Sequence, residues 1–260
     1  MARTIHPTAF VHPKAELGDD VEVGPFAYVG EFARIGKGTK LLHHACVEGH
    51  STIGDDNEIG SFSVIGGKPQ DLKYKGEPTR VEIGHRNQFR ESVTVNLGTV
   101  TGGGLTKVGS DCLVMAYCHI AHDCIIGDHV IMANYTGLSG HVTIEDWAIL
   151  SGMCGVTQNN TIGKHAFVGG LTAIRKDVAP YVIIVGDEPN EVRGVNRVGL
   201  KRRGFEGERF EAVVEACKIY FDSGLEKEQA LAELSRRFGD QADVRYFTDF
   251  IRKSKNGISR

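Results

Sequence analysis

Residues 116–127, AYCHIAHDCIIG, concentrate side chains that can do chemistry. His119 and His122 are three residues apart, Asp123 follows directly, and Cys118 and Cys124 flank them. Such a group can bind a metal ion, or it can supply a general base whose tautomer a carboxylate fixes. It can also be polar surface on a regular scaffold. The choice among the three depends on the fold that positions these residues.

Aliphatic residues recur with a period of six along most of the first 174 residues. The spacing fits neither an α-helix nor an alternating strand, and it is typical of a hexapeptide parallel β-helix. We expect three short strands to close each coil, with the aliphatic residue and a small residue two positions earlier pointing inward. The periodic positions are Ile5, Val11, Leu17, Val23, Val29, Ile35, Leu41, Val47, Ile53, Ile59, Ile65, then Ile83, Phe89, Val95, and finally Val108, Val114, Ile120, Ile126, Met132, Leu138, Ile144, Leu150, Val156, Ile162, Val168 and Ile174.

The repeat also suggests roles for the glycines and cysteines. The chain has 33 glycines in 260 residues, and many follow the periodic aliphatic residue. We expect them to relieve the corners between strands, where positive φ is easiest without a Cβ. Four of the six cysteines occupy the small inward position, which predicts reduced core residues rather than metal ligands or a disulfide framework. These four are Cys112, Cys118, Cys124 and Cys154.

Composition excludes several classes of protein. The net charge is −3, which argues against a protein that coats nucleic acid. The chain has no run of about 18 apolar residues and no apolar signal segment near its start, so we predict a cytoplasmic protein without stable membrane insertion.

Two insertions and a tail interrupt the repeat. Residues 66–80, GGKPQDLKYKGEPTR, and residues 97–107, LGTVTGGGLTK, are predicted loops inserted into a β-helix that spans residues 1–186. The period leaves open whether the second loop has a function. Residues 187–260 are expected to form a small helical domain that covers one end, with helices near 208–221, 226–238 and 243–253. The preceding GLKRRGF segment suggests anion binding.

Residues 18 apart should stack on the same face of such a solenoid. His122 then lies in one column with Gly140 and Gln158, and Asp123 lies beside His141 in the next. We favour general-base catalysis by His122, oriented by Asp123 or a nearby carbonyl, with the Gly140 N–H stabilising an oxyanion. The alternative is a zinc site of His119, His122 and His141 on a solenoid like that of the gamma-class carbonic anhydrases.

Four segments resemble the acyl-carrier-protein-dependent UDP-N-acetylglucosamine O-acyltransferase family, which performs the first step of lipid A biosynthesis. They are DLKYKGEPT (71–79), IAHDC (120–124), LSGH (138–141) and GLKRRGF (199–205), and the resemblance covers essentially the whole chain. It implies a left-handed β-helix and a homotrimer with active sites between neighbouring chains. It also implies transfer of an (R)-3-hydroxyacyl chain from acyl carrier protein to the 3-position of the sugar, with no metal and no other cofactor.

The resemblance also implies roles for individual residues. His122 is the expected base, Asp123 its orienting partner and Gly140 the oxyanion donor. Gly152 and Gly170 match the acyl-chain groove, where glycine at position 170 implies a longer chain. The residues expected to bind the acceptor nucleotide or the donor are Gln70, Asp71, Lys73, Asn96, His119, His141, Gln158, Asn196, Arg202 and Arg203.

Two departures from the family pattern bear on the acceptor. Asn96 and Leu97 stand where many members have His-Arg, and Thr157 stands where a histidine is usual. Some relatives acylate the 3-amino analogue of the sugar, so an amine acceptor remains an alternative. Two further rivals fit less well. The related N-acyltransferase of the same pathway has an extra N-terminal uridine-binding domain, and generic acetyl-CoA-dependent hexapeptide transferases lack the DLKYKGEPT loop.

Overall fold

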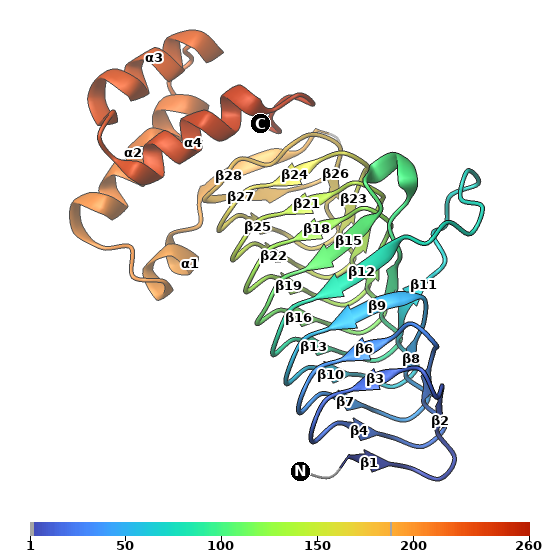
Figure 1. The fold of residues 1–260 in the computed structure, drawn as a ribbon. Coiled ribbons are helices and arrows are strands. Elements are labelled where there is room, and N and C mark those ends of the chain that lie inside the picture. The colour runs from blue at the N-terminus through green and yellow to red at the C-terminus, as the bar shows by residue number, and fades with distance from the viewer. Residues whose placement is uncertain (1–2, 188) are drawn as a thin grey trace.

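Short parallel strands stack in register to form a β-helix with three flat faces, as the period predicts (Figure 1). The β-helix is left-handed, as the family resemblance implies. The computed structural model describes residues 3–187 and 189–260. Residues 18 apart pair directly in most of the solenoid, as His119 pairs with Gly137 and Gly137 with Gly155. The column assignments made from the sequence therefore hold along this part of the chain.

Each face of the solenoid is one sheet. Sheet A contains, in spatial order, β1 (Thr4–Ile5), β4 (Glu22–Val23), β7 (Lys40–Leu41), β10 (Glu58–Ile59), β13 (Gln88–Phe89), β16 (Leu113–Val114), β19 (Ile131–Met132), β22 (Ile149–Leu150), β25 (Phe167–Val168), β27 (Val182–Val185) and β28 (Glu191–Val195). Sheet B contains β2 (Phe10–Val11), β5 (Tyr28–Val29), β8 (Cys46–Val47), β11 (Val64–Gly67), β14 (Thr94–Asn96), β17 (His119–Ile120), β20 (Gly137–Leu138), β23 (Gly155–Val156) and β26 (Ala173–Ile174). Sheet C contains β3 (Glu16–Leu17), β6 (Arg34–Ile35), β9 (His50–Ile53), β12 (Arg80–Ile83), β15 (Leu105–Val108), β18 (Ile125–Ile126), β21 (Thr143–Ile144) and β24 (Thr161–Ile162).

The chain runs from sheet B to sheet C to sheet A in each coil, and we name the corners by the sheets they join. Residues 121–124 and 139–142 lie at the B–C corner, residues 127–130 at the C–A corner and residues 133–136 at the A–B corner. The periodic aliphatic side chains fill the interior, and Ile120 and Val114 are completely buried. The four cysteines at the small inward position are buried free thiols, as predicted.

The glycines after the periodic aliphatic residues serve a different purpose from the one predicted. Gly54 and its equivalents do not have positive φ, which falls instead on residues such as Asp56, two positions later. A methyl group on Gly54 would lie 2.5 Å from the carbonyl oxygen of Gly84 in the next coil. These glycines are therefore required by the close approach of neighbouring coils, while residues with side chains adopt the left-handed conformation at the corners.

Both insertions leave the solenoid at the B–C corner of successive coils. The first connects β11 to β12, and the second connects β14 to β15 and contains a 3-10 turn, η1 (Val100–Gly102). Regular pairing resumes after each of them, since Ile53 pairs with Ile83, and Ile83 with Val108. The coil that follows carries His122 and Asp123 at the same corner, so the topology brings both loops to that edge of the prism.

The three predicted helices are confirmed as α2 (Gly207–Phe221), α3 (Lys227–Phe238) and α4 (Ala242–Lys253), and they lie at the C-terminal end of the solenoid (Figure 1). A short helix, α1 (Arg197–Arg202), was not predicted. Tyr181 of the last coil packs against Phe205 and Phe247, and Ile258 near the C-terminus forms a parallel bridge with Asp177. Among the described residues, no helix is both long and apolar enough to cross a membrane.

Candidate active site

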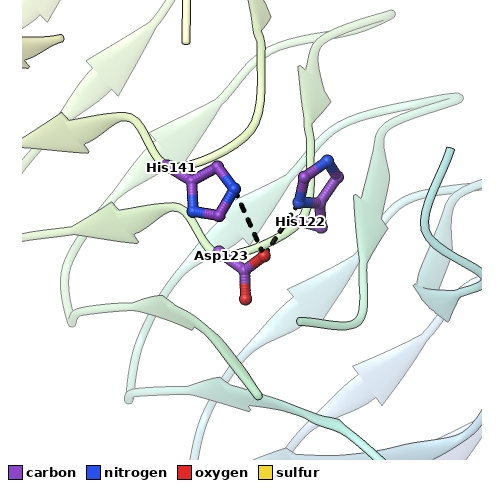
Figure 2. A group of neighbouring side chains, drawn as sticks. All are labelled: His122, Asp123 and His141. Carbon is purple, nitrogen blue, oxygen red and sulfur yellow. Dashed lines mark hydrogen bonds and ion pairs between the residues drawn. The ribbon is translucent and has the colours of Figure 1, made fainter. Parts of the chain in front are cut away.

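His122 and Asp123 form a hydrogen-bonded pair at the B–C corner (Figure 2). The Nδ1 atom of His122 lies 2.8 Å from Oδ2 of Asp123. The Asp123 side chain is 1% exposed and that of His122 13% exposed, so the carboxylate is sealed inside while one edge of the ring reaches the surface. A carboxylate accepts a hydrogen bond from Nδ1–H, and this tautomer leaves Nε2 free to take a proton.

Gly140 stacks directly above His122, one coil later. A methyl group at Gly140 would lie 2.4 Å from Cε1 and 2.7 Å from Nε2 of His122, so only glycine leaves room for the ring. Within residues 3–187 and 189–260, the Gly140 N–H makes no hydrogen bond, whereas the N–H groups of Ser139 and His141 donate to Val156 and His122. A free backbone donor beside the free edge of an imidazole can stabilise an oxyanion next to a general base.

His141 completes this group from the same coil as Gly140. Its Nε2 atom lies 3.8 Å from Oδ2 of Asp123, and its ring stands edge-on to His122 at a centroid distance of 5.1 Å (Figure 2). The ring is 32% exposed and faces the solvent side of the pair. Gln158, one coil further along the column of Gly140, is exposed. Both residues can therefore contact a ligand bound over His122.

The residues that hydrogen-bond to Asp123 were not identified from the sequence. Thr99 donates from its N–H to Oδ1 at 2.8 Å and from its hydroxyl to Oδ2 at 2.6 Å. The hydroxyl of Thr106 accepts from the Asp123 N–H at 2.8 Å. Thr99 lies in the second insertion, and Thr106 lies in β15, the strand that follows the insertion. The position of this insertion one coil before His122, at the B–C corner, was the available signal in the sequence.

The three histidines of the alternative zinc site do not form one group of possible ligands. In the described ranges, the group of possible metal ligands at this corner is His122, Asp123 and His141, whose ligand atoms lie within 4.8 Å of one another. His119 is not part of it and shares a 2.7 Å hydrogen bond with Thr94 instead. Burial lowers the pKa of His119, with a further contribution from His122, which favours its neutral form.

The remaining residues expected near His122 are divided between the first insertion and the neighbouring strand. Gln70, Asp71 and Lys73 lie on the projecting loop, where the Lys73 N–H donates to Oδ1 of Asp71 at 2.9 Å. Asn96 ends β14, one coil before His122, because Val95 pairs with Ile120. Its side chain is buried, and its Oδ1 atom has no hydrogen-bond partner among the described residues.

Asn196, Arg202 and Arg203 lie on a different face of the chain. They line a cavity of about 460 Å³ together with outward residues of sheet A such as Ile149 and Phe167. Asn196 caps α1 by accepting from the Gly199 N–H at 3.0 Å, and the Arg203 guanidinium lies 4.7 Å from the Trp147 ring centroid. One chain therefore does not bring these three residues to the corner of His122.

Gly152 and Gly170 lie at the A–B corner, across sheet B from His122. A methyl group at Gly170 would lie 3.4 Å from the Gly152 carbonyl oxygen, and one at Gly152 would lie 3.4 Å from the Asn134 carbonyl oxygen. Both are ordinary contacts, so a larger residue would fit at either position. Glycine at these positions leaves the surface without side chains. The outward column of sheet B between the two corners continues this surface, since His119 is followed by Gly137, Gly155 and Ala173. Sheet B therefore presents a strip almost free of side chains beside the His122 corner.

Family models match both parts of the chain. The bacterial transferase hexapeptide model matches residues 32–67 and 105–140, and the model of domain 2 of UDP-N-acetylglucosamine O-acyltransferase matches residues 177–259. The first falls within the solenoid, and the second covers its last turns and the helical tail.

Solved structures match over nearly the full length. LpxA of Bacteroides fragilis, a UDP-N-acetylglucosamine acyltransferase, is 39% identical over 99% of this chain and 100% of that chain, with a TM-score of 0.95. LpxA of Acinetobacter baumannii is 41% identical over 98% and 99% of the two chains, also with a TM-score of 0.95. The UDP-N-acetylglucosamine O-acyltransferase of Moraxella catarrhalis is 39% identical over 98% and 99%, with a TM-score of 0.94. On identity, coverage and shared architecture, this chain belongs to the LpxA family of UDP-N-acetylglucosamine acyltransferases.

Proposed function

We propose that the protein transfers an (R)-3-hydroxyacyl chain from acyl carrier protein to the 3-hydroxyl of UDP-N-acetylglucosamine, the first step of lipid A biosynthesis. The observation that carries this proposal is the packing of the His122 ring against Gly140, whose N–H makes no hydrogen bond among the described residues, with Asp123 buried behind the ring. Membership of the acyltransferase family supports the substrates.

His122 is the general base of this reaction. As the sugar oxygen attacks the thioester carbonyl, Nε2 takes the hydroxyl proton and Asp123 stabilises the charged ring through Nδ1–H. The carbonyl oxygen becomes an oxyanion and accepts from the Gly140 N–H. The carbon–sulfur bond then breaks, the ester remains on the sugar, and His122 returns its proton to the departing phosphopantetheine sulfur. Since the thioester is already activated, these groups suffice without a metal or redox cofactor.

Acceptor binding is assigned to the residues around this corner. Lys73 on the first insertion supplies positive charge for the diphosphate, while Gln70, Asp71, His141 and Gln158 supply donors and acceptors for the sugar and base. Polar groups on loops that leave a rigid scaffold commonly provide such contacts. His119 lies in the sheet beside them, with its ring bonded to Thr94.

A second copy of the chain completes the site in this proposal. Asn196, Arg202 and Arg203 are also assigned to the nucleotide or the donor, and they lie over sheet A rather than at the B–C corner. The A–B corner carries a ladder of large exposed side chains from successive coils, each between 55% and 72% exposed, namely Tyr117, Tyr135, Met153 and Leu171. Contiguous exposed apolar surface marks an interface. A homotrimer that places sheet B of one chain against sheet A of the next covers this ladder and joins the two halves.

The acyl chain is assigned to the bare strip of sheet B and the A–B corner. Gly152 and Gly170 leave this surface open, and a methyl group added at Gly137 or Gly155 would meet no atom of another coil within 4 Å. A smooth apolar strip between two packed chains suits a hydrocarbon, because the chain is removed from water as it binds.

A second candidate acceptor is the 3-amino analogue of the sugar, and one observation favours it. The buried Oδ1 atom of Asn96 has no hydrogen-bond partner in the described part of the chain, and such atoms usually have one. A hydroxyl donates its single proton to His122, whereas an amine keeps a second N–H that can donate to an amide oxygen. The product would then be an amide rather than an ester.

Replacement of His122 tests the proposed base. We expect His122→Ala to lower kcat for acyl transfer at least about 10²-fold, because a placed base contributes about 10²–10⁴. The measurement is the rate of UDP-sugar acylation with a 3-hydroxyacyl carrier protein, and His6→Ala, in the first coil, is the control expected to keep full activity. A fully active His122→Ala enzyme would exclude general-base catalysis by this residue.

Comparison of the two acceptors tests the role of Asn96. We expect the wild-type chain to acylate UDP-N-acetylglucosamine, and Asn96→Ala to reduce kcat/KM for the 3-amino sugar about 10-fold more than for the hydroxyl sugar. Product mass spectrometry distinguishes the ester from the amide. Equal losses with both sugars would show that the Asn96 oxygen does not select the acceptor.

Measurement of mass in solution tests the trimer. Light scattering is expected to give three times the chain mass, since the exposed apolar ladder needs a partner. The double variant Tyr117→Lys and Tyr135→Lys places like charges on that ladder and is expected to lower both the mass and the activity. A wild-type protein that is fully active at the mass of one chain would contradict the shared site.

Substitution at Gly170 tests the acyl groove. Gly170→Met adds bulk to the bare surface, so we expect the preferred donor to shift to a shorter 3-hydroxyacyl chain. Relative rates across a series of acyl carrier protein donors measure this shift. Thr172→Val is the control, because it replaces a buried neighbouring side chain with one of similar size and does not alter the surface. This variant should keep the wild-type preference for donor chain length. An unchanged chain-length profile in Gly170→Met would remove Gly170 from the groove.

A further inference from the structure

The second insertion closes around the Asp123 carboxylate. Thr99 approaches both oxygens, with its N–H 2.8 Å from Oδ1 and its hydroxyl 2.6 Å from Oδ2. The η1 turn follows directly, and its last residue, Gly102, faces the same carboxylate. The loop that the repeat pattern left without a function thus contacts the residue behind the proposed base.

Gly102 is required by this contact. A methyl group there would lie 2.0 Å from Cγ of Asp123, closer than any side chain can approach. The φ of Gly102 is not in the left-handed region, so glycine is explained here by space rather than by backbone conformation. The loop could not cover the carboxylate with any other residue at this position.

Both hydrogen bonds from Thr99 fix the plane of the carboxylate. Bonding from only His122 would hold one oxygen and leave the group free to rotate about its Cβ–Cγ bond. His141 offers a competing partner for the same oxygen, with Nε2 only 3.8 Å from Oδ2. With Oδ1 held by the Thr99 N–H and Oδ2 by its hydroxyl, Oδ2 stays directed at Nδ1 of His122, 2.8 Å away.

We propose that Thr99 is a positioning residue for acyl transfer, and that the 97–107 loop serves to hold the Asp123–His122 pair in its reactive orientation. The inference rests on the proposed role of His122 as the base and adds the residue that aligns it. Thr99 touches neither substrate in this assignment and acts through Asp123. Its loss should lower the rate of the chemical step without weakening substrate binding.

Removal of the Thr99 hydroxyl tests this inference. Thr99→Val keeps the shape and the backbone N–H bond, and we expect kcat to fall about 10- to 100-fold, the loss that is typical when a residue orienting a metal-bound histidine is replaced. KM for the UDP-sugar and for the acyl carrier protein donor should change less than about threefold. Thr99→Ser restores the hydroxyl and should recover activity to within about threefold of the wild type.

A matched control lies two residues away. The Thr101 hydroxyl is 3.1 Å from that of Thr99 and does not bond to Asp123 directly, so Thr101→Val should lower kcat far less than Thr99→Val does. Thermal unfolding of each variant shows whether the loop change has merely destabilised the fold. If Thr99→Val unfolds at the wild-type temperature but has a lower kcat, the loss comes from the orientation of the Asp123–His122 pair and not from a less stable fold.

A double variant separates positioning from other effects. On an Asp123→Asn background, Thr99→Val should cause little further loss of kcat, because the carboxylate it aligns is gone. An equal loss on both backgrounds, or a wild-type kcat in Thr99→Val, would overturn the inference. If His122→Ala is inactive and Thr99→Val is fully active, only this inference fails. If His122→Ala is itself active, the proposed function of the site fails first.

Discussion

The register between stacked coils is the constraint on which the active corner depends. Each coil donates its backbone N–H groups to the carbonyls of its neighbour, as the His141 N–H donates to the His122 carbonyl at 3.0 Å. Such parallel pairing fixes residues 18 apart in one column, because a slip would move inward side chains out of the core. The proposed base and the proposed oxyanion donor are therefore aligned by the same hydrogen bonds that hold the solenoid together.

The backbone conformation at the corners is energetically unfavourable, and the hydrogen bonds between stacked coils offset this cost in free energy. Asp123 and His141 both have positive φ, at 61° and 63°, a conformation in which residues other than glycine are uncommon. Aspartate and histidine tolerate positive φ better than branched residues do, and the pairing of the flanking strands holds the corner in this conformation. The corner therefore directs these side chains to the edge of the prism, where a ligand can reach them. A flat strand would not place side chains at this edge.

The features that follow from the six-residue period were predicted from the sequence, whereas contacts made by the insertions and between neighbouring coils were not. The columns of His122 with Gly140 and of Asp123 with His141 follow from spacing alone, and the structure has them stacked as expected. The role of the corner glycines was misjudged, because spacing does not reveal how closely the next coil approaches Gly54. Thr99 was missed for a related reason: an insertion breaks the period, so its fold back onto Asp123 cannot be read from columns.

The distribution of the candidate residues explains why one chain holds only part of the proposed site. The proposed chemistry needs a base and an oxyanion donor close together, and a rigid corner places His122 beside Gly140. Nucleotide and carrier recognition needs a larger surface, and here the residues assigned to it are divided between the B–C corner loops and the α1 face over sheet A. A regular prism has flat faces with shallow relief. In the proposed trimer, a second prism supplies the depth that excludes water from the thioester, and both the bare strip of sheet B and the apolar ladder beside it face that second prism.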